Sequence, residues 1–153
     1  MEIDEISGQV VDAAIDIHRR LGPGLLENVY ELVLAAALER RGLKVDRQVP
    51  VDIEYDGLRF NAAYRMDLLV EDRVVVEIKS VDGFSKAHGK QLLTYLRLSD
   101  QTVGLLLNFS CATMKEGIRR VVNDYRQPQE PSASPRLRVN QIEERRRCST
   151  LPE

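Results

Sequence analysis

The chain of 153 residues has no tryptophan, and aromatic residues make up only 5% of it. Its two cysteines, Cys111 and Cys148, lie far apart with no other metal-type ligands beside them, which argues against a disulfide framework and a zinc site. No apolar run approaches the roughly 20 residues that a membrane helix needs. The start, MEIDEISGQVV, also lacks the basic and apolar segments of a secretory signal. We expect reduced thiols, no membrane partner and a cytoplasmic location.

An excess of positive charge is missing too, because 22 basic side chains are balanced by 24 acidic ones and the formal net charge is −2. Residues 1–127 hold 17 basic and 20 acidic side chains, since 5 and 4 of these lie beyond Gln127. The overall charge therefore gives no argument for nucleic-acid binding. A polyanionic substrate would need a local basic patch or bridging metal ions.

The first third of the chain has the apolar spacing of helices. Residues 3–21 carry apolar side chains at intervals of three and four, which predicts an amphipathic helix. The break Gly22-Pro23-Gly24 follows, and Leu25–Arg41 is predicted as a second helix that ends at Gly42. At 43% hydrophobic and 30% charged residues, the whole chain has the composition of one globular domain.

From residue 43 to residue 80 apolar and polar residues alternate, with the turn signal Asp56-Gly57 between two extended runs. This pattern predicts three or four antiparallel strands. Residues 84–100 return to helical spacing, residues 102–109 form a nearly all-apolar strand, and residues 117–124 suit a last strand or a short helix. We predict an α/β fold in which helices flank a mixed sheet.

The composition changes after Arg126, where three prolines occur within nine residues and no apolar period follows. We therefore predict a domain over residues 1–126 and a disordered tail over residues 127–153. Arg145-Arg146-Arg147 in this tail could contact nucleic acid, although a solvated charge run is the commoner meaning of such a cluster.

The segment YRMDLLVEDRVVVEIKS, residues 64–80, places charges among residues that ought to be buried. Strand alternation puts Glu77 and Lys79 on one face of the sheet. The position of Asp67 depends on the turn. A three-residue turn, Glu-Asp-Arg, pairs Val70 with Val74 and sets Asp67 opposite Glu77, whereas a two-residue turn would put the carboxylates on opposite faces. We predict the three-residue turn.

Two carboxylates about 5 Å apart repel each other, so one of them would be protonated unless a cation lies between them. Mg²⁺ or Mn²⁺ prefers oxygen ligands and can bind a phosphate oxygen at the same time. Lys79 could then orient the attacking water or stabilise the charge that develops in phosphodiester hydrolysis. The alternative is a surface ion pair on an edge strand, as Glu-x-Lys pairs often are.

Two helical patterns add candidate residues. Glu27 and Tyr30 stand three apart on one face of the second predicted helix, although a preference of acids for helix N-termini would also explain Glu27. His88, Gln91 and Tyr95 share a face of the third predicted helix, and the leucines occupy the opposite one. That polar stripe either serves a site on the sheet or is the solvent face, and the sequence leaves both open.

Together these features resemble the small bacterial GxxExxY proteins, a branch of the PD-(D/E)XK nuclease-like superfamily. The name motif is Gly24 to Tyr30, the superfamily Asp and Glu-x-Lys elements match Asp67 and Glu77 to Lys79, and QLLTYL and GLLLNF match two downstream segments. The match spans about residues 5–125. Met66 stands where the superfamily name has proline.

The resemblance implies a restriction-endonuclease-like αβββαβ core and a metal-dependent nuclease acting on DNA or, alternatively, RNA. It implies Asp67, Glu77 and Glu27 as ligands of Mg²⁺ or Mn²⁺. Lys79 would be the catalytic lysine, and Gln91 a polar residue of the catalytic set. Tyr30, Tyr95 and His88 are expected to support the site.

Two functions on the same scaffold remain as alternatives, a non-catalytic nucleic-acid-binding module and a protein-interaction module. A homodimer is also considered, because many small nuclease cores need a second subunit to embrace a duplex.

Overall fold

A computed structural model describes residues 1–124, in which three helices and five strands form two helical layers around one sheet. Helix α1 spans Ile3–Leu21 and helix α2 spans Glu27–Arg40. Helix α2 starts two residues later than predicted because Leu26 is extended, with ψ at 152°, and Gly24 has a φ of 107° that favours glycine. The tail predicted for residues 127–153 lies outside the described residues.

The alternation predicted three or four antiparallel strands in the middle of the chain, and the structure has three. They are β1 (Val45–Tyr55), β2 (Leu58–Val70) and β3 (Val74–Lys79). Helix α3 (Lys86–Leu98) then crosses over to β4 (Val103–Asn108), which pairs with β3 in parallel. The uncertain last element is a strand, β5 (Ile118–Val122), antiparallel to β4. The sheet order is β1-β2-β3-β4-β5, so β3 is the central strand.

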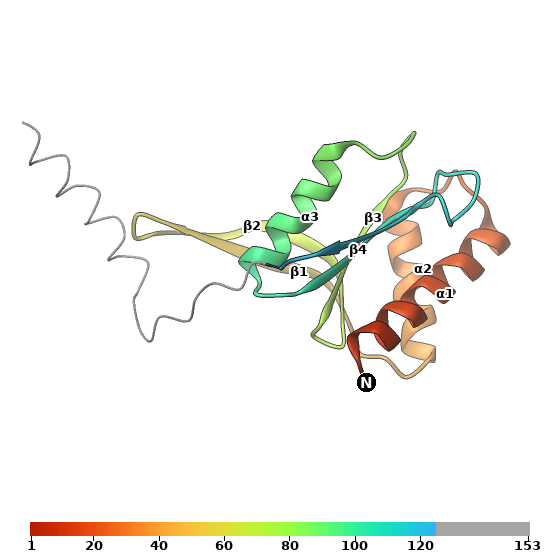
Figure 1. Ribbon diagram of the computed structural model, residues 1–153, viewed down its shortest axis with the longest axis horizontal. Helices are drawn as coiled ribbons and strands as arrows, with labels where there is room; N and C mark the ends of the chain where they lie inside the picture. Colours follow the sequence, from red (N-terminus) through yellow and green to blue (C-terminus); the bar gives the residue numbers. More distant parts are fainter. Residues whose placement is uncertain (125–153) are drawn as a thin grey trace, which may run out of the picture.

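Helices cover both faces of this mixed sheet, which confirms the predicted α/β architecture. Helices α1 and α2 pack on one face around buried residues such as Val10, Leu34 and Ile78. Helix α3 packs on the other face, where Leu92 and Leu96 belong to a second buried cluster that includes Val75. Figure 1 shows α3 and the α1–α2 pair on opposite sides of the strands. The alternating residues of β3 therefore belong to two different cores.

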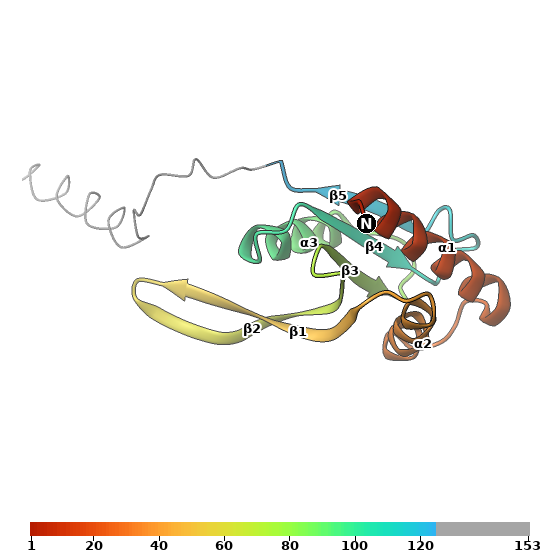
Figure 2. The same cartoon turned by 90° about the horizontal axis from the view of Figure 1, so that it is seen from below.

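The β1–β2 hairpin extends well beyond the helices, as both views show (Figures 1 and 2). Its tip is the predicted Asp56-Gly57 turn, and Tyr55 beside it is 73% exposed. Within residues 1–124 no helix is long and apolar enough to cross a membrane.

Candidate active site

The turn between β2 and β3 decides whether the two central carboxylates meet. Val70 pairs with Val74 and Leu68 with Val76, so the loop is residues 71–73 and the predicted three-residue turn is confirmed. Continuing this register by one residue sets Asp67 opposite Glu77. The backbone N–H of Ile78 donates a hydrogen bond to Asp67 Oδ2 at 2.8 Å, which fixes the aspartate against β3.

Glu77 is a buried carboxylate on the central strand. Glu77 is only 5% exposed, and its strand, β3, lies between β2 and β4, so it is not an edge strand. Burial, followed by the nearby charge of Asp67, raises the pKa of Glu77 to about 7. The alternative of a surface ion pair on an edge strand is therefore wrong. A carboxylate that is costly to ionise and set beside a second one is typical of a functional site.

Lys79 forms an ion pair with Glu77. Its Nζ lies 3.5 Å from Glu77 Oε1, and its side chain is 17% exposed. Burial also raises the pKa of Asp67, as does the charge of Glu31, while Lys79 acts in the opposite direction. One ammonium thus does not compensate for the two carboxylates.

One observation indicates that the carboxylates of the site could bind a divalent cation. Glu77 Oε2 is buried and has no hydrogen-bond partner within the described part of the chain. A buried carboxylate oxygen without a partner is unfavourable, and a hard cation would satisfy it together with Asp67. Asp67 and Glu77 would hold the ion. Yet no three acidic, histidine or cysteine side chains among residues 1–124 are close enough together to form a ready metal cluster.

Glu27 lies at the rim of the site, in the first turn of α2. Its Oε1 accepts a hydrogen bond from the backbone N–H of Ser80 at 3.1 Å, directly after Lys79. Its charge also contributes to the raised pKa of Asp67. The side chain is thus within electrostatic reach of Asp67, but one of its oxygens already accepts the Ser80 N–H just beyond β3, and its role as a third ligand stays a prediction.

Glu31 is a site residue that the sequence reasoning did not assign. It lies one turn after Glu27 on α2 and is only 5% exposed. Arg47 forms an ion pair with it at 3.0 Å, and Gln48 Nε2 donates to its Oε2 at 2.8 Å. The spacing of four from Glu27 was the available signal, because residues four apart share a helical face.

Gln48 joins Glu31 to the aspartate of the site. Its Nε2 also lies 3.4 Å from Asp67 Oδ1, and its backbone has a left-handed φ of 52°. This conformation is uncommon for a residue with a side chain, and it occurs where β1 runs beside Asp67. The amide therefore bridges helix α2 and strand β2 at the carboxylates.

The residues of the polar stripe on α3 have two different surroundings, the carboxylate site and the N-terminal end of the helix. Tyr95 is 4% exposed, and its pKa is raised to about 12 by burial and then by Glu77 and Asp67. Gln91 Nε2 donates to the Tyr95 hydroxyl at 2.8 Å. His88 Nδ1 accepts the Ser85 N–H at 3.3 Å and so caps the helix. Tyr95 thus faces the sheet, in one buried cluster with Leu92 and Leu96, so the expectation that the leucines lie on the opposite face is wrong for this residue. Gln91 is half-buried beside it.

Tyr30 holds the loop that leads into α2. Its hydroxyl donates to the carbonyl of Gly22 and accepts from Leu25 N–H, and its ring stacks on Phe109 with centroids 4.2 Å apart. This loop positions Glu27, because Ser80 Oγ in turn donates to the carbonyl of Leu25 at 2.9 Å. The Gly-x-x-Glu-x-x-Tyr segment therefore couples the start of α2 to the end of β3.

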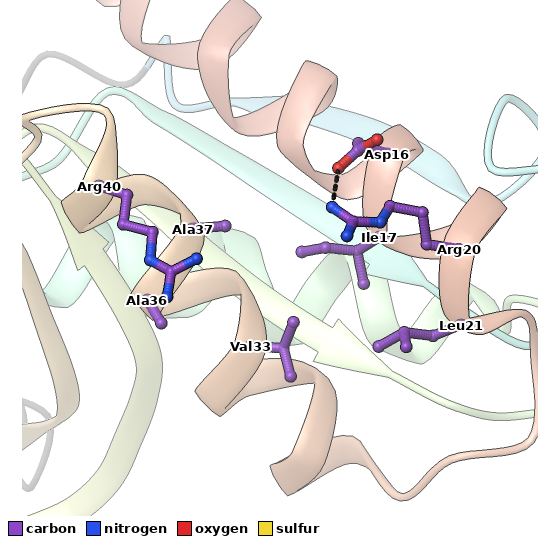
Figure 3. A pocket seen from close by; sticks show the side chains of 8 residues that line it. All are labelled: Asp16, Ile17, Arg20, Leu21, Val33, Ala36, Ala37 and Arg40. Atoms are coloured by element: carbon purple, nitrogen blue, oxygen red, sulfur yellow. Dashed lines mark hydrogen bonds and ion pairs between the residues drawn. The ribbon is translucent and has the colours of Figure 1, made fainter.

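A separate pocket of about 380 Å³ lies between α1 and α2. Figure 3 shows Ile17 and Val33 pointing into it, with Arg20 paired to Asp16 at 3.4 Å. The two helices cover the other face of the sheet from α3, so this pocket is separate from the carboxylates. It has no group arranged for the chemistry described above.

The mixed sheet between helices, with paired Asp and Glu-x-Lys side chains on adjacent central strands, defines a nuclease-like class of fold and site. Residues 4–121 match the family described as the PD-(D/E)XK nuclease superfamily, and the chain belongs to that superfamily. Comparisons with curated proteins and with solved structures found no match. Membership indicates a nuclease-like function with a nucleic-acid substrate.

Proposed function

We propose that the protein is a metal-dependent nuclease that hydrolyses phosphodiester bonds in DNA, with RNA as the alternative substrate. The observation that carries the proposal is the buried Glu77 Oε2, which has no hydrogen-bond partner among the described residues and belongs to the carboxylate set beside Asp67. The other oxygen of that carboxylate, Oε1, lies 3.5 Å from Lys79 Nζ. Mg²⁺ or Mn²⁺, when bound, supplies a Lewis acid for a phosphate oxygen. The Gly24–Tyr30 motif supports placing the chain with the GxxExxY proteins.

The side chains have separate parts in this reaction. Asp67 and Glu77 would hold the ion, and Glu27, whose Oε1 accepts the Ser80 N–H, is the proposed third ligand. Lys79 orients the attacking water and stabilises negative charge as it develops on the phosphate. Gln91 keeps the Tyr95 hydroxyl fixed, and burial raises the pKa of this hydroxyl further above neutral pH.

The direct test incubates the purified protein and Mg²⁺ or Mn²⁺ with linear, supercoiled and single-stranded DNA and with RNA. Asp67→Ala and Lys79→Ala should each reduce cleavage by at least about 100-fold, the usual loss when a group that stabilises transition-state charge is removed. Asp12→Ala is the matched control, because Asp12 is an exposed carboxylate on α1. Cleavage that persists unchanged in both site variants would overturn the assignment.

The mildly acidic charge of residues 1–127 supports a second candidate, a module that binds nucleic acid or protein without cleaving. Metal-independent binding with no turnover on any of the four substrates would select it. If duplex DNA is cleaved, a homodimer is expected, and sedimentation of the protein with and without duplex would test that state.

A further inference from the structure

A second groove lies on the α3 side of the sheet, next to the carboxylates. It has a volume of about 370 Å³, within the range of small-ligand pockets. Its lining combines aromatic and polar side chains from β2 and α3: Tyr64, Ala87, His88, Gln91, Thr94 and Tyr95. The roles proposed above leave the open surface of this groove unused.

Tyr95 connects this groove to the site. It lines the groove, and the charges of Glu77 and Asp67 contribute to its raised pKa, so its hydroxyl lies within their electrostatic reach. Tyr64, on the same strand as Asp67, precedes it by three residues. A ligand in the groove would therefore be adjacent to whatever the carboxylates hold.

The groove offers an open aromatic surface. The rings of Tyr64 and Tyr95 have centroids 5.3 Å apart and a tilt of 53°, so the buried Tyr95 supports one side of Tyr64. Tyr64 nevertheless remains 36% exposed. A supported, part-exposed ring is suited to stacking with a flat aromatic ligand.

Donors and acceptors stand beside this ring. His88 Nδ1 accepts the Ser85 N–H, so in the neutral imidazole Nε2 carries the proton and can donate. Gln91 uses its amide nitrogen on Tyr95, and its amide oxygen remains an acceptor. One donor and one acceptor near an aromatic surface match the hydrogen-bonding edge of a nucleobase.

Positive charge lies along the same helix. Lys90 falls three residues after Ala87 and four before Thr94, so it shares their side of α3, and it is exposed. Lys86 is exposed one turn earlier. Ammonium groups at the rim of an aromatic groove can neutralise the phosphates that flank a stacked base.

We propose that this groove binds one unpaired nucleobase of a single-stranded nucleic acid, next to the phosphate at Asp67 and Glu77. A base in a duplex has both faces covered by its neighbours, so stacking on Tyr64 requires an unpaired base. The proposal rests on the proposed function for the position of the scissile phosphate. The groove itself could bind a base without any cleavage.

The test measures fluorescence anisotropy of labelled oligonucleotides of about ten nucleotides, a length suited to single-strand sites. Single-stranded DNA, single-stranded RNA and blunt duplex DNA are compared in EDTA with the full chain. Tyr64→Leu should raise the Kd for at least one single strand by about tenfold or more, because it removes base stacking. Tyr64→Phe retains the ring and should retain the affinity. Tyr55→Leu is the matched control, since Tyr55 is a 73% exposed tyrosine at the hairpin tip.

Equal single-strand affinities of Tyr64→Leu and the wild type would overturn the proposal, and so would duplex binding as tight as single-strand binding. Failure of the proposed function looks different. If the protein cleaves nothing with Mg²⁺ but binds single strands in a Tyr64-dependent way, the groove proposal holds and the nuclease proposal fails. If the protein cleaves but its single-strand affinity does not depend on Tyr64, the nuclease proposal holds and the groove proposal fails.

Discussion

Replacing Glu77 by glutamine should make the metal-free protein more stable at alkaline pH. Burial raises the pKa of Glu77 from its ordinary 4.5 to about 7, so ionising it costs free energy in the folded chain. Below about pH 4 the group is protonated in both states. Between about pH 4.5 and pH 7 the unfolded chain releases the proton first, so the folded chain binds more protons and its stability falls as pH rises. Glutamine cannot ionise, so the stability of the variant does not fall with pH for this reason.

The size of the effect follows from the same pKa. A change from 4.5 to about 7 corresponds to about 3 kcal/mol, because each pKa unit is worth about 1.4 kcal/mol. The repulsion between Glu77 and Asp67 adds to this cost, whereas the 3.5 Å ion pair between Glu77 and Lys79 reduces it. The two carboxylates titrate as a pair, so the loss is expected to be spread over the pH range.

Urea unfolding of the wild type and Glu77→Gln in EDTA, from about pH 4.5 to about pH 8.5, measures the difference directly. The gap in unfolding free energy should widen with pH in favour of the variant. Excess Mg²⁺ or Mn²⁺ at about 100 times its Kd should then restore about 2.7 kcal/mol to the wild type at alkaline pH, and less to the variant. A gap that stays constant within about 0.5 kcal/mol over this range would refute the reasoning about burial.

Two further substitutions test the scaffold and the support of the site. Gly117→Ala should destabilise the fold by at least about 2 kcal/mol, because its Cβ would overlap the backbone oxygen of Asn108, whereas Gly8→Ala on α1 meets no atom and should stabilise by up to about 1 kcal/mol. Thermal unfolding compares the two variants, and equal melting temperatures would contradict the close contact between Gly117 and the Asn108 backbone. Gln48→Asn keeps the left-handed backbone but shortens the bridge to Asp67, so metal affinity or cleavage should fall about tenfold with the fold intact. Unchanged metal affinity and cleavage would show that the Gln48 amide does not position Asp67.

The strands of the site were largely predictable, because their pattern is local. Alternation in VVVEIK requires Glu77 and Lys79 to share a face, and the structure brings them to 3.5 Å. The position of Asp67 was a choice between two turns, and the pairing of Val70 with Val74 decided it. No local rule separates a three-residue from a two-residue turn here, since Glu71 and Asp72 adopt left-handed φ values without a glycine.

The helical contributions were harder to foresee. Glu31 on α2 binds Arg47 and Gln48, which lie on a different element, β1, so these contacts depend on how the helix packs on the sheet. The stripe on α3 could not be assigned to sheet or solvent from its period alone, because periodicity gives a face without saying what covers it. Tyr95 is buried in the cluster between α3 and the sheet, whereas His88 caps its own helix.

The sequence by itself determined the order of the elements, the shared face of Glu77 and Lys79, and the motifs that link the chain to its superfamily, because these depend on neighbours along the chain. The tertiary structure alone decided that β3 is central and that Glu77 is buried with one oxygen lacking a partner. Those properties arise when β2, β4 and α3 exclude water from the carboxylate. Burial changes the cost of its charge, and that cost is what a bound cation would offset.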